Sequence, residues 1–178
     1  MKKILLLFII CAATTAVAQK KYTTEKASVT FFSHAPLEDI KATNVKSSAI
    51  YNADNGEIAF SVPMKEFKFK KSLMQQHFNE KYIESDKFPK ATFTGKIVGF
   101  KQDATGPQQV KAQGKLTIHG VTKDIDVPGT IEVQGKKLQV LSKFMVKVAD
   151  YDITIPQLVF QNIAEEVEVT IDFTFKPM

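Results

Sequence analysis

The sequence has no tryptophan, one cysteine and three histidines in 178 residues. Its only cysteine, Cys11, lies near the amino terminus, within a segment that we expect to be removed. A mature chain without a thiol has no disulfide, no cysteine nucleophile and no thiolate metal site. The histidines, His34, His77 and His119, are far apart in sequence, and none belongs to the i, i+4 pair of a helical metal site.

Motifs of common enzyme classes are also missing: the chain has no nucleophile elbow, phosphate-binding loop or dinucleotide fingerprint. Three pairs of polar residues are weak candidates for a metal or an acid–base site: His77 with Glu80, Asp124 with Asp126, and Asp150 with Asp152. A metal site needs more ligands than one pair, and alternate carboxylates on a strand share a face without being buried. We therefore expect no metal, no cofactor and no catalytic activity.

No apolar run is long enough for a transmembrane helix, which needs about 20 such residues. The amino terminus instead has Lys2 and Lys3, an apolar run over 4–13, and the small residues Ala16 and Ala18, which is the pattern of a secretory signal peptide. We expect cleavage of residues 1–18, a single domain over 19–178, and a periplasmic or secreted protein. A lipoprotein anchored through Cys11 is the alternative, disfavoured by the bulky residue that precedes this cysteine.

The charge of the chain is mildly basic. The formal net charge of +5 falls by the two leader lysines to +3 in the mature chain. This surplus allows transient contact with an anionic membrane surface, but it is not the concentrated patch of a nucleic-acid-binding protein. The segment 65–71 alternates lysine with phenylalanine, which a strand with one apolar face explains. We expect no nucleic-acid partner.

Most of the mature chain alternates apolar and polar residues with the period of a β-strand. The expected strands are 27–34, 45–52, 58–64, 91–100, 110–119, 125–133, 138–148 and 167–175. A turn at 54–56 makes the second and third of these a hairpin. Near Pro63 the apolar residues change from even to odd positions, which predicts a break in the strand there.

One short helix interrupts the strands. Ser72 and Gln75 have the spacing of a capping box, which predicts that a helix begins there. Met74, Phe78 and Tyr82 recur every four residues and form one apolar stripe. Such a stripe indicates that one side of the helix packs against the strands.

About eight antiparallel strands can close into a barrel or pair as two packed sheets. Closure removes the exposed edges that promote aggregation, so we predict an all-β, antiparallel barrel of about eight strands with one short helix. The interior of such a barrel can hold one small ligand. Periodicity does not distinguish a filled core from an open cavity.

Two sequence blocks resemble a known family. The first comprises His77, Phe78, Glu80, Tyr82, Lys87, Phe88, Pro89, Ala91, Thr92, Phe93 and Gly95, and the second is the run GKLTIHGVTK over 114–123. Together they resemble the YceI-like family of lipid and polyisoprenoid-binding proteins. The resemblance implies an extended, lipocalin-like barrel with an elongated apolar lumen.

We therefore predict a non-catalytic carrier that holds a long-chain lipid or isoprenoid in the barrel, with the helix over one mouth. The residues expected to contact this ligand are Phe31, Phe60, Phe67, Met74, Phe78, Tyr82, Phe93, Ile118, Phe144, Val169, Ile171 and Phe173. Each of them would suit an ordinary core equally well. Two alternatives stay open: an interaction or stress-response module with a filled core, and an enzyme that modifies a lipid in the lumen.

Overall fold

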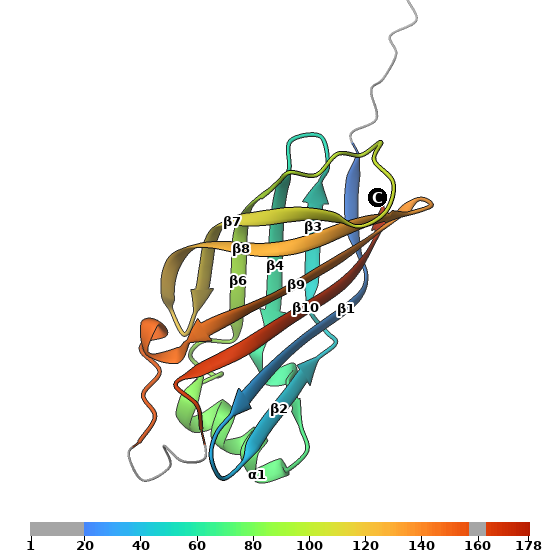
Figure 1. Cartoon of the computed structure of the whole chain (residues 1–178). Helices are drawn as coiled ribbons and strands as arrows, with labels where there is room; N and C mark the ends of the chain where they lie inside the picture. The colour runs from blue at the N-terminus through green and yellow to red at the C-terminus, as the bar shows by residue number, and fades with distance from the viewer. Residues whose placement is uncertain (1–19, 157–162) are drawn as a thin grey trace, which may run out of the picture.

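A single antiparallel sheet forms the molecule and closes on itself (Figure 1). The computed structural model describes residues 20–156 and 163–178, so the predicted signal peptide and Cys11 lie outside the described residues. The strands are β1 (Lys21–His34), β2 (Asp39–Asn44), β3 (Ser48–Asn52), β4 (Glu57–Pro63), β5 (Lys68–Phe69), β6 (Lys90–Val98), β7 (Gln108–Ile118), β8 (Val121–Gln134), β9 (Lys137–Lys147) and β10 (Glu166–Pro177).

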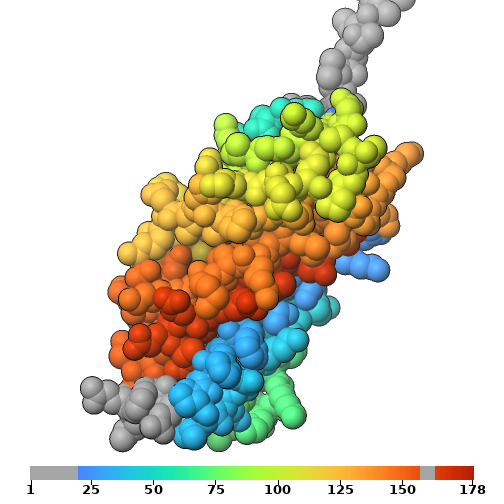
Figure 2. Space-filling model, in the orientation of Figure 1, coloured from blue at the N-terminus to red at the C-terminus, as the bar shows by residue number. Residues whose placement is uncertain are grey.

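The first and last long strands close the barrel. β1 pairs with β10 from Tyr22 opposite Pro177 to Phe32 opposite Glu168, and the two lie side by side as the blue and red bands of Figure 2. Eight strands form the ring, in the order β1, β10, β9, β8, β7, β6, β4 and β3. The short strands β2 and β5 extend the sheet beyond this ring. The predicted fold, an all-β antiparallel barrel of eight strands with one short helix, is confirmed.

One end of the barrel carries the helical segments (Figure 1). After β4 the chain forms the 3-10 turn η1 (Met64–Glu66), which is the predicted break at Pro63. β5 then leads into α1 (Ser72–His77) and the π-helical segment η2 (Phe78–Tyr82). The predicted capping box is wrong, because Lys71 is the N-cap and no side chain caps it. The side chain of Gln75 instead accepts the backbone N–H of Phe69 at 3.5 Å.

The strand β2 was not predicted, and β3 begins later than expected because an asparagine turn separates the two. Asn44 is fully buried at the end of β2. Its amide donates to the carbonyl of Pro63 at 2.7 Å, while its Oδ1 accepts the Lys46 N–H at 2.8 Å and the Ser47 hydroxyl at 3.2 Å. A buried side chain that makes three hydrogen bonds fixes the turn.

Aromatic residues fill the barrel end that lies away from the helix. Tyr51 lies 6.4 Å from Tyr22, 6.2 Å from Phe100 and 6.4 Å from Phe175, between ring centroids. We call these four residues the aromatic plug. Burial raises the pKa of Tyr51 to about 12, helped by its neighbour Tyr22. No helix in the described part of the chain is long and apolar enough to cross a membrane.

Candidate ligand-binding cavity

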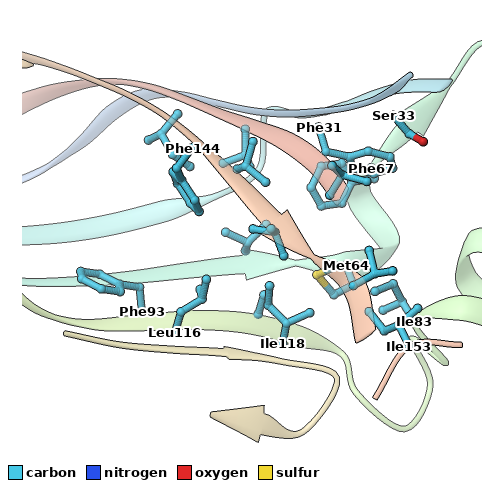
Figure 3. A pocket seen from close by; sticks show the side chains of 18 of the residues that line it. Phe31, Ser33, Met64, Phe67, Ile83, Phe93, Leu116, Ile118, Phe144 and Ile153 are labelled. Carbon is cyan, nitrogen blue, oxygen red and sulfur yellow. The ribbon is translucent and has the colours of Figure 1, made fainter. Parts of the chain in front are cut away.

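The barrel encloses a cavity of about 480 Å³, lined mainly by apolar side chains that point inward from its strands. This volume lies within the usual range for sites that bind small molecules. Figure 3 shows Phe93, Leu116 and Ile118 along one wall of the cavity, with Phe31 and Phe144 across from them. Inward apolar side chains alternate with outward, mostly polar ones along the long strands, which is how the period-2 pattern produces an apolar lumen.

Most residues predicted to contact a ligand do line this cavity. The lining includes Phe31, Phe60, Phe67, Met74, Phe78, Tyr82, Phe93, Ile118, Phe144, Val169 and Ile171. Phe173 does not line it: its ring is fully buried and stacks on Phe60, with centroids 4.9 Å apart. Phe173 thus supports the wall, whereas ligand contact by the other residues stays a prediction.

Four phenylalanines gather under the helix, and we call them the phenylalanine cluster. Phe78 lies 5.4 Å from Phe31, 5.6 Å from Phe67 and 5.1 Å from Phe69, between ring centroids. Phe31 also contacts Phe67 at 5.4 Å and Phe69 at 5.6 Å. The cluster joins β1, β5 and the helical segment, so the helix covers this mouth of the barrel as the apolar stripe predicts.

Several polar groups of the lining lie near the helical end. Glu38 and Lys71 form an ion pair there, and His77 and Tyr82 also border the cavity. Burial raises the pKa of Tyr82 above its ordinary value, and the protonated hydroxyl can donate to a polar head group. The nearby Ser33 is buried, and its hydroxyl accepts the Ala164 N–H at 2.9 Å. This end therefore suits the polar part of an amphipathic ligand.

Several lining residues escaped prediction because they lie in irregular segments. Met64, Ile83 and Ile153 are buried, line the cavity, and lie in or beside the turns at its helical end (Figure 3). The even-position pattern of the expected strand 58–64 includes Met64, but no period places Ile83 or Ile153, which lie in loops, on a particular side. A strand residue such as Leu116 has that period, and alternation with Ile118 could have found it.

The partly buried histidine–carboxylate pair, His119 with Glu84, lies away from the cavity lining. His119 Nε2 is 3.1 Å from Glu84 Oε2, and its Nδ1 donates to the carbonyl of Tyr151 at 3.1 Å. Neither His119 nor Glu84 borders the cavity. Across residues 20–156 and 163–178, no group of three potential metal ligands comes together. The cavity can thus bind an apolar chain, but this pair is not placed to act on it.

Comparison with known proteins agrees with this architecture. A model of the YceI-like domain matches residues 21–175. A polyisoprenoid-binding domain from Saccharophagus degradans, implicated in plant cell wall breakdown, superposes with a TM-score of 0.75 at 16% identity, over 88% of this chain and 98% of that one. BcnA from Burkholderia cenocepacia superposes with a TM-score of 0.70 at 17% identity, over 83% and 95% of the two chains.

A third solved structure, the YceI protein of Campylobacter jejuni, superposes with a TM-score of 0.63 at 19% identity, over 98% of this chain and 97% of that one. No curated protein matches the sequence. At these identities the structural matches establish the fold.

Proposed function

This chain belongs to the YceI-like domain family, and we propose that it is a non-catalytic carrier of a long apolar chain, a lipid or an isoprenoid. The observation that carries the proposal is the cavity of about 480 Å³ with its mainly apolar lining. A related domain from Saccharophagus degradans is described as polyisoprenoid-binding, which supports the ligand class.

Burial of the chain supplies the affinity. Each buried methylene contributes about 0.8 kcal/mol, so a few isoprene units gain on the order of 10 kcal/mol before ordering costs. This gain needs no specific hydrogen bond. The polar groups at the helical end, including Lys71 and Tyr82, then orient the head group while the hydrocarbon extends into the barrel.

The leader pattern supports a location in the periplasm or outside the cell as part of this proposal. There its modest positive charge favours transient contact with anionic membrane surfaces, where an apolar ligand is loaded or released. The cavity favours the carrier over a module with a filled core. His77 is the histidine that borders the cavity, and in the described part of the chain no hydrogen bond joins it to a carboxylate, which favours the carrier over an enzyme that modifies a lipid in the lumen.

Mass spectrometry of an organic extract of the purified protein tests the proposal. We would compare wild type with Ile171→Trp, which places an indole in the lumen, and with Ile50→Trp at a position that is 52% exposed on the outer surface. Wild type and Ile50→Trp should release the same long-chain species, and Ile171→Trp much less. Folding of both variants is checked by circular dichroism. The carrier function would be contradicted if all three proteins released equal amounts of the long-chain species, or if the wild type released no such species.

A further inference from the structure

The pairing between β8 and β9 stops half-way along both strands. Gly129 opposite Ser142 is the last pair, although β8 begins at Val121 and β9 continues to Lys147. The rest of β8 pairs with β7 alone, and the rest of β9 with β10 alone. Figure 1 shows the two strands running together from their hairpin and then diverging. The turn η3 (Val148–Tyr151) contacts both strands beyond this separation.

Pro128 explains why the pairing ends where it does. The Ser142 hydroxyl donates to the Pro128 carbonyl at 2.6 Å, so this carbonyl faces β9. A strand residue directs its N–H and C=O to the same neighbour, and proline has no N–H to offer. The strands are close up to this point, because a Cβ on Gly129 would lie 2.8 Å from the Leu141 carbonyl oxygen. Beyond Pro128 they separate.

The internal cavity extends to this separation. Its lining includes Gly129 and Ser142, which belong to the inward-facing set of their strands, and also Pro128 and Leu141, which belong to the outward-facing set. Pro128 and Leu141 lie where the pairing of β8 with β9 ends, so the cavity reaches the edge of the paired wall there. Leu141 is 43% exposed, and Met145 on the same face of β9 is 55% exposed. The opening therefore has an apolar rim on the β9 side.

Both ends of the barrel are more obstructed than this side. The aromatic plug fills one end, and the phenylalanine cluster lies under the helix at the other. The cavity does reach Lys71 and Leu73 beside the helix, but the polar Glu38–Lys71 pair borders that route. Passage of a hydrocarbon past an ion pair and four packed rings requires those side chains to move. At the side, one hydroxyl–carbonyl hydrogen bond joins the strands where they part.

We propose that the apolar chain enters and leaves the barrel sideways, through the gap between β8 and β9 bounded by Pro128, Ser142 and η3. The inference rests on the proposed carrier function and identifies its route. A sideways opening lets a flexible chain slide in along its length, so it need not thread end-first past the phenylalanine cluster. The exposed Leu141 and Met145 keep the chain against apolar surface as it crosses the rim.

A covalent link across the gap tests this route. Asp126 and Met145 lie three residues beyond the last β8–β9 pair, Gly129 opposite Ser142, on the two sides of the gap, and both are exposed. We would join Asp126→Cys to Met145→Cys with a short bis-maleimide, using the same unlinked double variant as its control. A second link, between Glu132→Cys and Gln139→Cys, joins residues that are already paired and controls for the chemistry. Stopped-flow fluorescence then gives association and dissociation rates for the anthraniloyl ester of geranylgeraniol.

The link across the gap should slow association and dissociation together by about tenfold or more, with little change in Kd, because a blocked route alters rates and not the bound state. The link in the paired half should leave both rates unchanged. Unchanged rates in the gap-linked protein, or a weaker Kd with unchanged association, would overturn the side route while the carrier function stands. Absence of binding by the wild type would overturn the carrier function itself, and the route with it.

A variant that loosens the gap gives the opposite effect. Ser142→Ala removes the hydroxyl that bonds to Pro128, so both rates should rise severalfold with Kd nearly constant. Thr174→Ala is the matched control, because the Thr174 hydroxyl donates to Gln139 away from the gap at 3.0 Å. Equal effects of the two variants would count against the side route.

Discussion

The rings of Phe31 on β1 and Phe78 in η2 stack with their centroids 5.4 Å apart and their planes inclined by 25°. An aromatic pair of this kind contributes about 0.5 to 1.5 kcal/mol beyond the burial of its surface. Residues from the first strand and from the helical segment, far apart in the chain, are thus joined at one end of the cavity. This contact makes the helix a part of the cavity wall.

Replacing Phe78 tests whether the helix is a wall or a gate. Phe78→Leu should weaken ligand binding by raising the dissociation rate with association unchanged, because the variant loses contact surface and no passage opens. Phe78→Ala should also lower the free energy of unfolding by about 3 kcal/mol, near the lower limit for a core phenylalanine, because the ring is only partly exposed. Stopped-flow rates and urea unfolding provide both values.

A gating helix would give another result. If α1 and η2 opened to admit the ligand, Phe78→Leu would raise the association and dissociation rates together and leave Kd nearly constant. Lys81→Ala is the control for the helix surface, because Lys81 is exposed and does not line the cavity, so the variant should change the rates and the stability little.

Tyr51 in the aromatic plug should make the protein sensitive to alkali. Its pKa rises to about 12 in the folded protein, from an ordinary value near 10. Its contribution to stability is thus complete below about pH 10 and is lost as the pH rises toward 12, because the unfolded chain releases this proton first. The slope is at most about 1.4 kcal/mol per pH unit. Urea unfolding at stepped pH should show this loss in wild type and a smaller one in Tyr51→Phe.

The regular strands could be predicted because their residues alternate without interruption. In β10, Val167, Val169 and Ile171 face the cavity and alternate with polar residues, which gives a strand and its inner face at once. Closure of the barrel, although not the pair of strands that closes it, followed from the cost of an exposed edge. Most of the predicted cavity residues were therefore placed on the correct side of the wall.

Other features could not be predicted because they depend on contacts between distant segments. Phe173 packs against the ring of Phe60 and does not line the cavity. This contact joins two distant strands, so no local sequence pattern predicts it. The buried turn at Asn44 depends on the Pro63 carbonyl from another strand. The gap beside Pro128 requires the pairing register of β8 with β9, whereas the sequence shows only a proline within an apparent strand.

His119 should stabilise the helical end of the barrel. It has a φ of 51° and joins Glu84, whose φ is 46°, to the backbone of Tyr151 through two hydrogen bonds. Such conformations persist where surrounding contacts hold them in place. His119→Ala should lower the free energy of unfolding by about 1 to 3 kcal/mol, measured in urea.

His34 supplies the control for this substitution. It also pairs with a carboxylate, that of Asp39, but its side chain is 79% exposed. His34→Ala should therefore change stability by less than about 0.5 kcal/mol. If His119→Ala lowered the free energy of unfolding by an equally small amount, the hydrogen bonds of His119 would make no net contribution to stability.

Export of the protein should remove its leader. We predict that the mature chain begins at Gln19, because the small residues Ala16 and Ala18 precede that bond. Intact-mass measurement of protein from the periplasmic or secreted fraction checks this prediction. A species that retains Cys11 with an attached diacylglyceryl group would instead show a lipoprotein.

Gly95 on β6 and Gly114 on β7 face each other in the sheet, and each belongs to one of the two sequence blocks that resemble the family. A Cβ on Gly95 would lie 2.2 Å from the Gln113 carbonyl oxygen, and one on Gly114 would lie 2.3 Å from that of Thr94. Backbone atoms cannot move aside as a flexible side chain can. Gly114→Ala should therefore lower the free energy of unfolding by about 3 kcal/mol or more, measured by urea denaturation.

Gly135 separates this steric effect from the general cost of losing a glycine. It has a φ of +65° in the hairpin between β8 and β9, and a Cβ there would have no neighbour within 4 Å. Gly135→Ala should thus cost only the left-handed backbone penalty of about 1 to 2 kcal/mol. Gly114→Ala should therefore lower the free energy of unfolding by more than Gly135→Ala does. Equal losses would show that the backbones of β6 and β7 move apart at little cost in free energy, which contradicts the steric argument from their close contact.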